Sequence, residues 1–167
     1  MRITDFFKNV FGFGNKDACV LKISLMVAAL DGVVADEELH EVQALLAEKV
    51  KSEETRKTLW AECLRCAGYV LLLAKIFSRD ELVSAFVQES LDILNPELPS
   101  LEPDVINQAF DAWTAVAKSD GDFCALEMDA LAALRKAVQE QQTRLLEAIS
   151  VSAGVLEPAG GISSVPR

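Results

Sequence analysis

The sequence has few of the residues that usually carry catalysis or cross-linking. A single histidine, one tyrosine and four cysteines occur among its 167 residues. There is no second histidine to share acid-base work, no Ser, His and Asp set, and no phosphate-cradling glycine loop. The cysteines lack the dense pattern of a secreted disulfide scaffold, and no secretory leader opens the chain. We therefore expect a non-enzymatic protein of a reducing, cytoplasmic compartment.

Long hydrophobic runs and strand-like alternation are also missing. The most apolar stretch, residues 66–77, holds about a dozen residues where a membrane-spanning helix needs roughly twenty, and Lys75 interrupts it. This stretch predicts a buried core helix. No segment alternates apolar and polar residues between hairpin turns. With 51% apolar residues the chain can close one core, so the predicted fold class is all-α.

Basic residues are scarce relative to acidic ones. Asp and Glu outnumber Lys and Arg by 26 to 16, which gives a net charge of −10. A surface of this sign repels phosphate backbones and anionic lipid headgroups. Nucleic acid is therefore excluded as a partner, whereas a basic protein could dock on the acidic surface.

The first fifteen residues predict a short amphipathic helix that two glycines, Gly12 and Gly14, bring to an end. Its apolar face consists of Ile3, Phe6, Phe7, Val10 and Phe11. Such a face can lie in a membrane interface, which would make the protein peripheral at the inner membrane through Phe6, Phe7, Val10 and Phe11. It can equally pack on its own domain, and the sequence leaves both alternatives open.

Helical periodicity continues through most of the remaining chain. Ser52 and Ser78 are predicted helix caps, and Pro103 suits the first turn of a helix. The expected helices span residues 18–30, 36–51, 53–77, 78–94, 103–118 and 125–149. We expect a compact bundle of about seven helices: residues 1–15 as a terminal helix, 16–149 as the domain, with halves at 16–94 and 103–149, and 150–167 as a flexible tail.

Two parts of the chain resemble each other. Residues 25–46 and 114–135 align without gaps at an offset of 89, and seven of the twenty-two positions are identical. Ordinary composition predicts roughly two. The shared unit is a helix, an Asp-Gly turn and a second helix. This repeat predicts two similar helical hairpins that pack about a pseudo-two-fold axis.

The repeated pattern, Asp31-Gly32 to Glu38 and Asp120-Gly121 to Glu127, resembles the tellurite-resistance TerB-like family. The resemblance covers most of the chain, from about residue 16 to residue 148. It implies a small helical bundle with an internal duplication. It also implies a cytoplasmic, sometimes membrane-associated, metal-sensing or scaffolding role in stress response, and no catalytic reaction.

The acidic turns themselves suggest a site for a divalent cation. An Asp in a turn and a Glu early in the next helix can direct hard oxygen ligands at one point, which favours calcium. The candidate ligands are Asp31, Glu38, Asp120, Asp122 and Glu127. The second half is richer, because Val33 replaces the acid found at Asp122. The first half of an EF-hand loop is missing, so an ordinary EF-hand is excluded.

Two other readings stay open. The Asp-Gly turns can be ordinary helix caps, in which case the protein is a structural module that contacts a protein or a membrane and holds no metal.

Cys63 and Cys66 share one helix face, but zinc would need two more ligands, so we expect core thiols. His40 is expected on a solvated face.

Overall fold

The computed structural model describes residues 15–154, and this part of the chain contains helices and no strands. The prediction of an all-α fold is confirmed. The elements are α2 (Asn15–Ala28), α3 (Asp36–Lys49), α4 (Glu53–Ile76), α5 (Arg79–Leu94), the 3-10 turn η1 (Leu98–Ser100), α6 (Pro103–Lys118) and α7 (Ala125–Gly154). The predicted terminal helix lies outside the described residues, so the count of seven helices is not tested.

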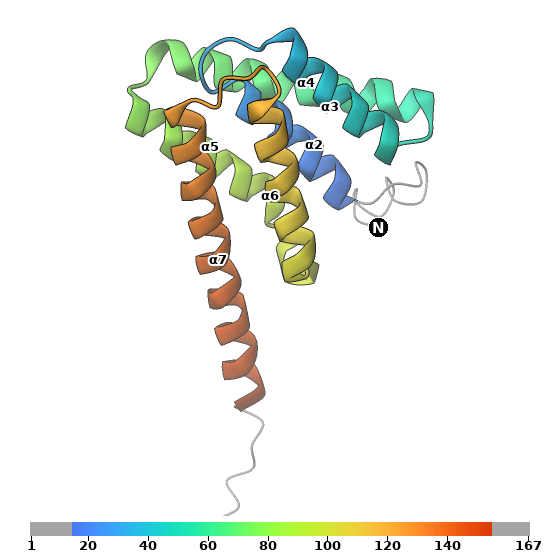
Figure 1. Cartoon of the computed structure of the whole chain (residues 1–167). Helices are drawn as coiled ribbons and strands as arrows, with labels where there is room; N and C mark the ends of the chain where they lie inside the picture. Colours follow the sequence, from blue (N-terminus) through green and yellow to red (C-terminus); the bar gives the residue numbers. More distant parts are fainter. Residues whose placement is uncertain (1–14, 155–167) are drawn as a thin grey trace, which may run out of the picture.

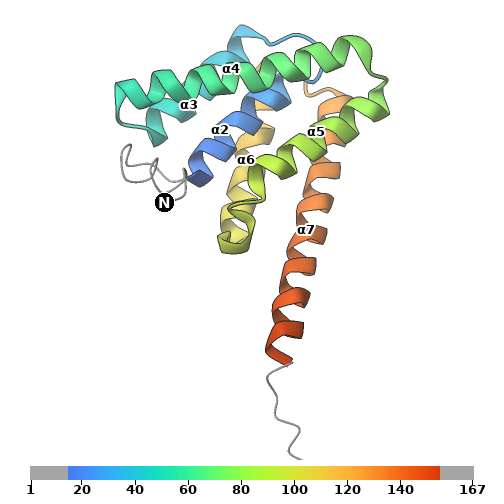
Figure 2. The same cartoon turned by 180° about the vertical axis from the view of Figure 1, so that it is seen from behind.

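Helix α2 forms the centre of the bundle. It lies between α4 and α6 (Figure 1, Figure 2) and also packs on α3 and α5. The side chains from Leu25 to Leu30 are completely buried, as the apolar sequence on all sides of this helix requires. Since α4 and α6 lie in different halves of the chain, the burial of α2 between them holds the two halves together.

Local capping residues set several helix starts. The Ser52 hydroxyl accepts a hydrogen bond from the Thr55 amide at 3.3 Å and begins α4. Ser78 and Glu81 form a capping box at the start of α5. Pro103 occupies the first turn of α6, where its missing N–H costs nothing. These three predictions are confirmed.

The prediction that residues 66–77 form a buried core helix is correct for one side of the helix and wrong for the other. Val70 and Leu73 are buried, but the opposite side of this stretch faces outward, with Leu72 58% exposed. We call the exposed side chains the α4 apolar face; they are Leu64, Tyr69, Leu72, Ile76 and Phe77. Only α2, α3 and α5 cover α4 to any extent among the described elements, so its outer side has no neighbour.

Helix α7 extends well beyond the other helices (Figure 1, Figure 2). It continues to Gly154, so residues 150–154 belong to a helix and not to the predicted tail. Leu146 and Ile149 on this extension are more than 60% exposed. Within the described residues, no helix combines the length and the apolar composition needed to cross a bilayer.

Candidate functional site

The two Asp-Gly turns have the same backbone conformation. Gly32 has φ of +90° and Gly121 has φ of +86°, in the left-handed region that favours glycine. The Gly32 amide donates to the Ala29 carbonyl at 3.2 Å, and the Gly121 amide donates to the Lys118 carbonyl at 3.0 Å. The repeated Asp-Gly sequence therefore produces a repeated turn.

The aspartate of each turn accepts a hydrogen bond from the backbone two residues ahead. Asp31 Oδ1 accepts from the Val33 amide at 2.9 Å, and Asp120 Oδ1 accepts from the Asp122 amide at 2.8 Å. Both aspartates are exposed. Their first role is to hold the turn, and each keeps its second carboxylate oxygen for other contacts.

The glutamates are buried and cap the helices that follow. Glu38 is 3% exposed and its Oε2 accepts from the Ala35 amide at 2.9 Å; Glu127 is 2% exposed and accepts from the Cys124 amide at the same distance. Ala35 offers no side-chain acceptor in return, so only the glutamate half of a capping box is present. Burial of two carboxylates is costly and needs a further explanation.

The fold brings the two turns to one end of the bundle. Helices α2 and α6 run side by side, and both views place the loops that follow them at the same end (Figure 1, Figure 2). Helices α3 and α7 begin there. The positive ends of their dipoles favour the carboxylates of Glu38 and Glu127.

Electrostatics show that acids from both turns act on one another. Burial raises the pKa of Glu38 from 4.5 to about 7, against the effect of the Ala35 hydrogen bond, and the charges of Glu127, Asp120 and Asp31 raise it further. Burial likewise raises the pKa of Glu127, with Asp31 and Asp120 adding to the effect. Four of the five predicted site residues are therefore close enough to interact electrostatically. We call these four residues the acidic cluster.

The fifth predicted ligand stays apart. Asp122 is exposed and contributes its amide to Asp120. In residues 15–154, no three His, Cys, Asp or Glu side chains are arranged so that they could hold a metal ion. The residues of the acidic cluster thus raise one another's pKa values across the two turns, but they do not form a preorganised metal-binding site.

The remaining candidates keep their expected structural roles. All four cysteines are free thiols. Burial raises the pKa of Cys63 to about 12 and also raises that of Cys66, which disfavours the thiolate that zinc requires. His40 is exposed on α3, as the prediction of a solvated face requires.

Substitution of either turn glycine by alanine is expected to cost about 1 to 2 kcal/mol of stability, because an L-residue is strained at positive φ. A Cβ at Gly121 would meet no atom within 4 Å, and one at Gly32 would meet the Ala74 Cβ at an ordinary 3.9 Å. Urea unfolding measures the cost. Gly68→Ala on α4 is the matched control and should stabilise the protein instead. A neutral Gly121→Ala would contradict the turn geometry.

Comparison with known proteins gives no further guide to this site. The chain matches no protein-family model, and no curated protein or solved structure matches it. The functional argument therefore depends on the residues and their arrangement.

Proposed function

We propose that the chain is a non-enzymatic, TerB-like cytoplasmic module whose acidic cluster binds a divalent cation in a sensory or stress-response role. The support is that Glu38 and Glu127, one from each turn and both buried, have pKa values raised in part by the charges of Asp31 and Asp120. Helix capping explains each turn separately. It does not require acids of two turns 89 residues apart to lie within electrostatic range of one another.

The internal duplication is part of this proposal. Hydrogen bonds in the first turn have counterparts at an offset of 89 in the second: Ala35 to Glu38 corresponds to Cys124 to Glu127. We propose that the two halves derive from one repeated hairpin and are related by a pseudo-two-fold axis. Such an axis would place the two glutamates symmetrically, each supplying the carboxylate oxygen that its helix cap does not use.

The ligand inventory defines what kind of ion the cluster suits. Carboxylate oxygens are hard ligands, which calcium and magnesium prefer over softer metals. Calcium takes six to eight oxygens, whereas magnesium keeps several waters and binds through one or two carboxylates. Since the described residues offer no group of three ligands in place, we propose an ion that stays partly hydrated. Calcium is the ion that the sequence favours, and magnesium is the direct comparison.

The test is thermal unfolding of chelator-treated protein with calcium, magnesium, manganese or zinc at constant ionic strength. An ion at a hundredfold excess over its dissociation constant stabilises the folded state by about 2.7 kcal/mol, which raises the midpoint by several degrees. In the double variant Asp120→Asn with Glu127→Gln the increase should disappear. The amide oxygens of this variant still accept the backbone hydrogen bonds, so the caps persist.

Glu81→Gln is the matched control for this experiment. Glu81 caps α5 in the same manner as Glu127 caps α7, but it is exposed and no acid contributes to its pKa. Its variant should keep the full ion effect. An equal shift in the double variant would mean that the ion binds elsewhere, and no shift with any of the four ions would contradict cation binding.

A second candidate function is an interaction module without metal. The observation that favours it is the α4 apolar face, which no described element covers. Exposed Arg65 and Lys75 lie on the same helix of a chain whose net charge is −10. This combination fits a partner with apolar and acidic side chains. Absence of any ion effect in the unfolding experiment would favour this candidate.

A further inference from the structure

The α4 apolar face has a charge pattern of its own. Tyr69, Leu72 and Ile76 follow one another at intervals of three and four residues, so their side chains form one stripe along the outer side of α4. Arg65 continues this stripe by one turn, and Lys75 lies one turn from Leu72. Both cations are exposed. The stripe therefore combines apolar side chains with positive charge on a chain whose net charge is −10.

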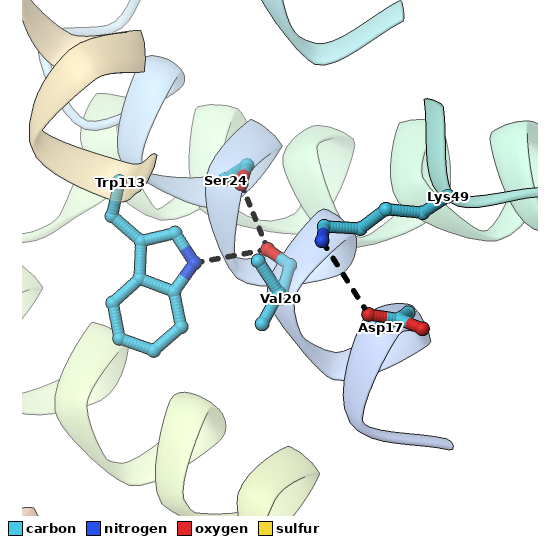
Figure 3. Close-up of polar contacts among 5 residues, drawn as sticks. All are labelled: Asp17, Val20, Ser24, Lys49 and Trp113. Carbon is cyan, nitrogen blue, oxygen red and sulfur yellow. Dashed lines mark hydrogen bonds and ion pairs between the residues drawn. The ribbon is translucent and has the colours of Figure 1, made fainter. Parts of the chain in front are cut away.

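These two cations have no acidic partner in the described part of the chain. Lys49 of α3, by contrast, forms an ion pair with Asp17 of α2 at 3.7 Å (Figure 3). The ion pairs among the described residues include neither Arg65 nor Lys75. Residues 63–79 contain no Asp or Glu that could supply a partner from an adjacent turn. The positive charge of the stripe is therefore available to another molecule.

We propose that the α4 apolar face binds an amphipathic helix of another protein, in which acidic residues flank the apolar side. The inference rests on the second candidate function, the interaction module, and does not require cation binding. The bound helix lies along α4, with its apolar side on the stripe and its acids beside Arg65 and Lys75. The exposed apolar side chains extend from Leu64 to Phe77, which corresponds to about 20 Å of helix.

Gly68 supports a helical partner at this position. It is exposed on the outer side of α4, one turn from Leu64 and one turn from Leu72. Glycine weakens a helix interior relative to alanine, yet a Cβ at Gly68 would meet no atom of the described chain within 4 Å. Internal packing therefore gives no reason for a glycine here. The missing side chain allows the backbone of a second helix to approach α4 closely.

Two other occupants fit the charges less well. Helix α5 lies on the same side of the bundle as α4 (Figure 1, Figure 2), and it exposes Asp80, Glu81 and Asp92. A flat anionic bilayer on this side would approach these acids, whereas a single helix along α4 is narrower. A second copy that docked through the same face would bring the Arg65 and Lys75 side chains of both copies into one interface, where like charges repel.

Titration of the full chain with two synthetic peptides tests the proposal. Each peptide is an amphipathic helix of about 18 residues with leucines on one side; one has glutamates beside the leucines and the other has lysines. Tyr69 is the only tyrosine of the chain, so ¹³C-labelled tyrosine gives a single NMR signal on the α4 apolar face. The glutamate peptide should shift this signal and should bind about tenfold more tightly than the lysine peptide, as measured by fluorescence anisotropy.

Reversal of the two cations should reverse this preference. An exposed ion pair changes affinity by up to about fivefold, and Arg65→Glu with Lys75→Glu turns two attractions into two repulsions. The double variant should therefore bind the glutamate peptide about tenfold more weakly and the lysine peptide more tightly than the wild type does.

A matched pair of variants tests the apolar contacts. Leu72 on α4 and Leu146 on α7 are 58% and 65% exposed, so neither substitution by Asp disturbs the core. Leu72→Asp should abolish binding of the glutamate peptide, and Leu146→Asp should leave it unchanged. Circular dichroism confirms that each variant keeps its helices.

Three results would overturn the proposal. The first is equal affinity for the two peptides, or no shift of the Tyr69 signal with either. The second is a Tyr69 signal that broadens with protein concentration alone, which would assign the face to a second copy. The third is a shift with phosphatidylserine vesicles but not with the glutamate peptide, which would assign it to a bilayer. All titrations contain chelator, so a failure of the cation proposal does not affect them.

Discussion

Replacement of Trp113 by alanine is expected to lower the free energy of unfolding by about 3 to 5 kcal/mol. Trp113 is 1% exposed and its ring packs edge-on against Phe110, with centroids 4.7 Å apart. Its indole N–H also joins α6 to the Val20 carbonyl of α2. Truncation therefore removes apolar contacts and a hydrogen bond from the centre of the bundle at once.

Two further variants separate these contributions in urea unfolding. Trp113→Phe keeps most of the apolar volume but loses the N–H, and the Val20 carbonyl still accepts from Ser24, so its cost should be smaller. Trp60→Ala on α4 is the control, because Trp60 is only half-buried. A Trp113→Ala variant no less stable than Trp60→Ala would contradict the central place of this side chain.

Features encoded by adjacent residues were predictable from the sequence. A hydroxyl cap such as Ser52 depends on an amide three residues away, and a first-turn proline such as Pro103 depends only on the local backbone. The Asp-Gly turns belong to the same class. In both copies the aspartate reaches the amide two residues ahead and the glycine takes positive φ, as the repeated sequence suggests.

Features that depend on distant packing were not predictable in the same way. The hydropathy of residues 66–77 indicates an apolar helix, but it cannot say which side the other helices cover. Val70 faces the core and Leu72 faces outward as a result of tertiary packing alone. Helix α7 similarly continues to Gly154. Its last residues are exposed, so the sequence has no buried apolar stripe there that would predict a helix.

The candidate site shows the same division. The sequence singled out Glu38 and Glu127 but could not show that one oxygen of each is bound by a helix-cap amide. It also favoured the second turn because of Asp122, whose side chain is exposed and whose amide serves Asp120. Only the arrangement of α2 and α6 brings acids of both turns to one place.

Glu38→Gln is expected to stabilise the protein at pH 8 and to change its stability little near pH 4.5. Because the pKa of Glu38 is raised from 4.5 to about 7, the protonated carboxyl stabilises the fold at low pH, and this contribution is lost as the pH rises through 7. At about 1.4 kcal/mol per pKa unit, this rise in the pKa of Glu38 corresponds to a loss of stability of about 3 kcal/mol at pH 8. Glutamine avoids the buried charge and still accepts the Ala35 amide.

Glu81→Gln provides the opposite pH dependence. Hydrogen bonds from the Ser78 amide and hydroxyl lower the pKa of this exposed carboxylate, so its contribution is present above the ordinary pKa and lost as the pH falls. The Glu81 variant should therefore lose stability at pH 7 and match the wild type in acid. Urea unfolding from pH 4 to pH 8 without divalent ions measures both variants. Parallel pH profiles for the two would show that Glu38 is an ordinary helix cap and that its acidic neighbours have no effect.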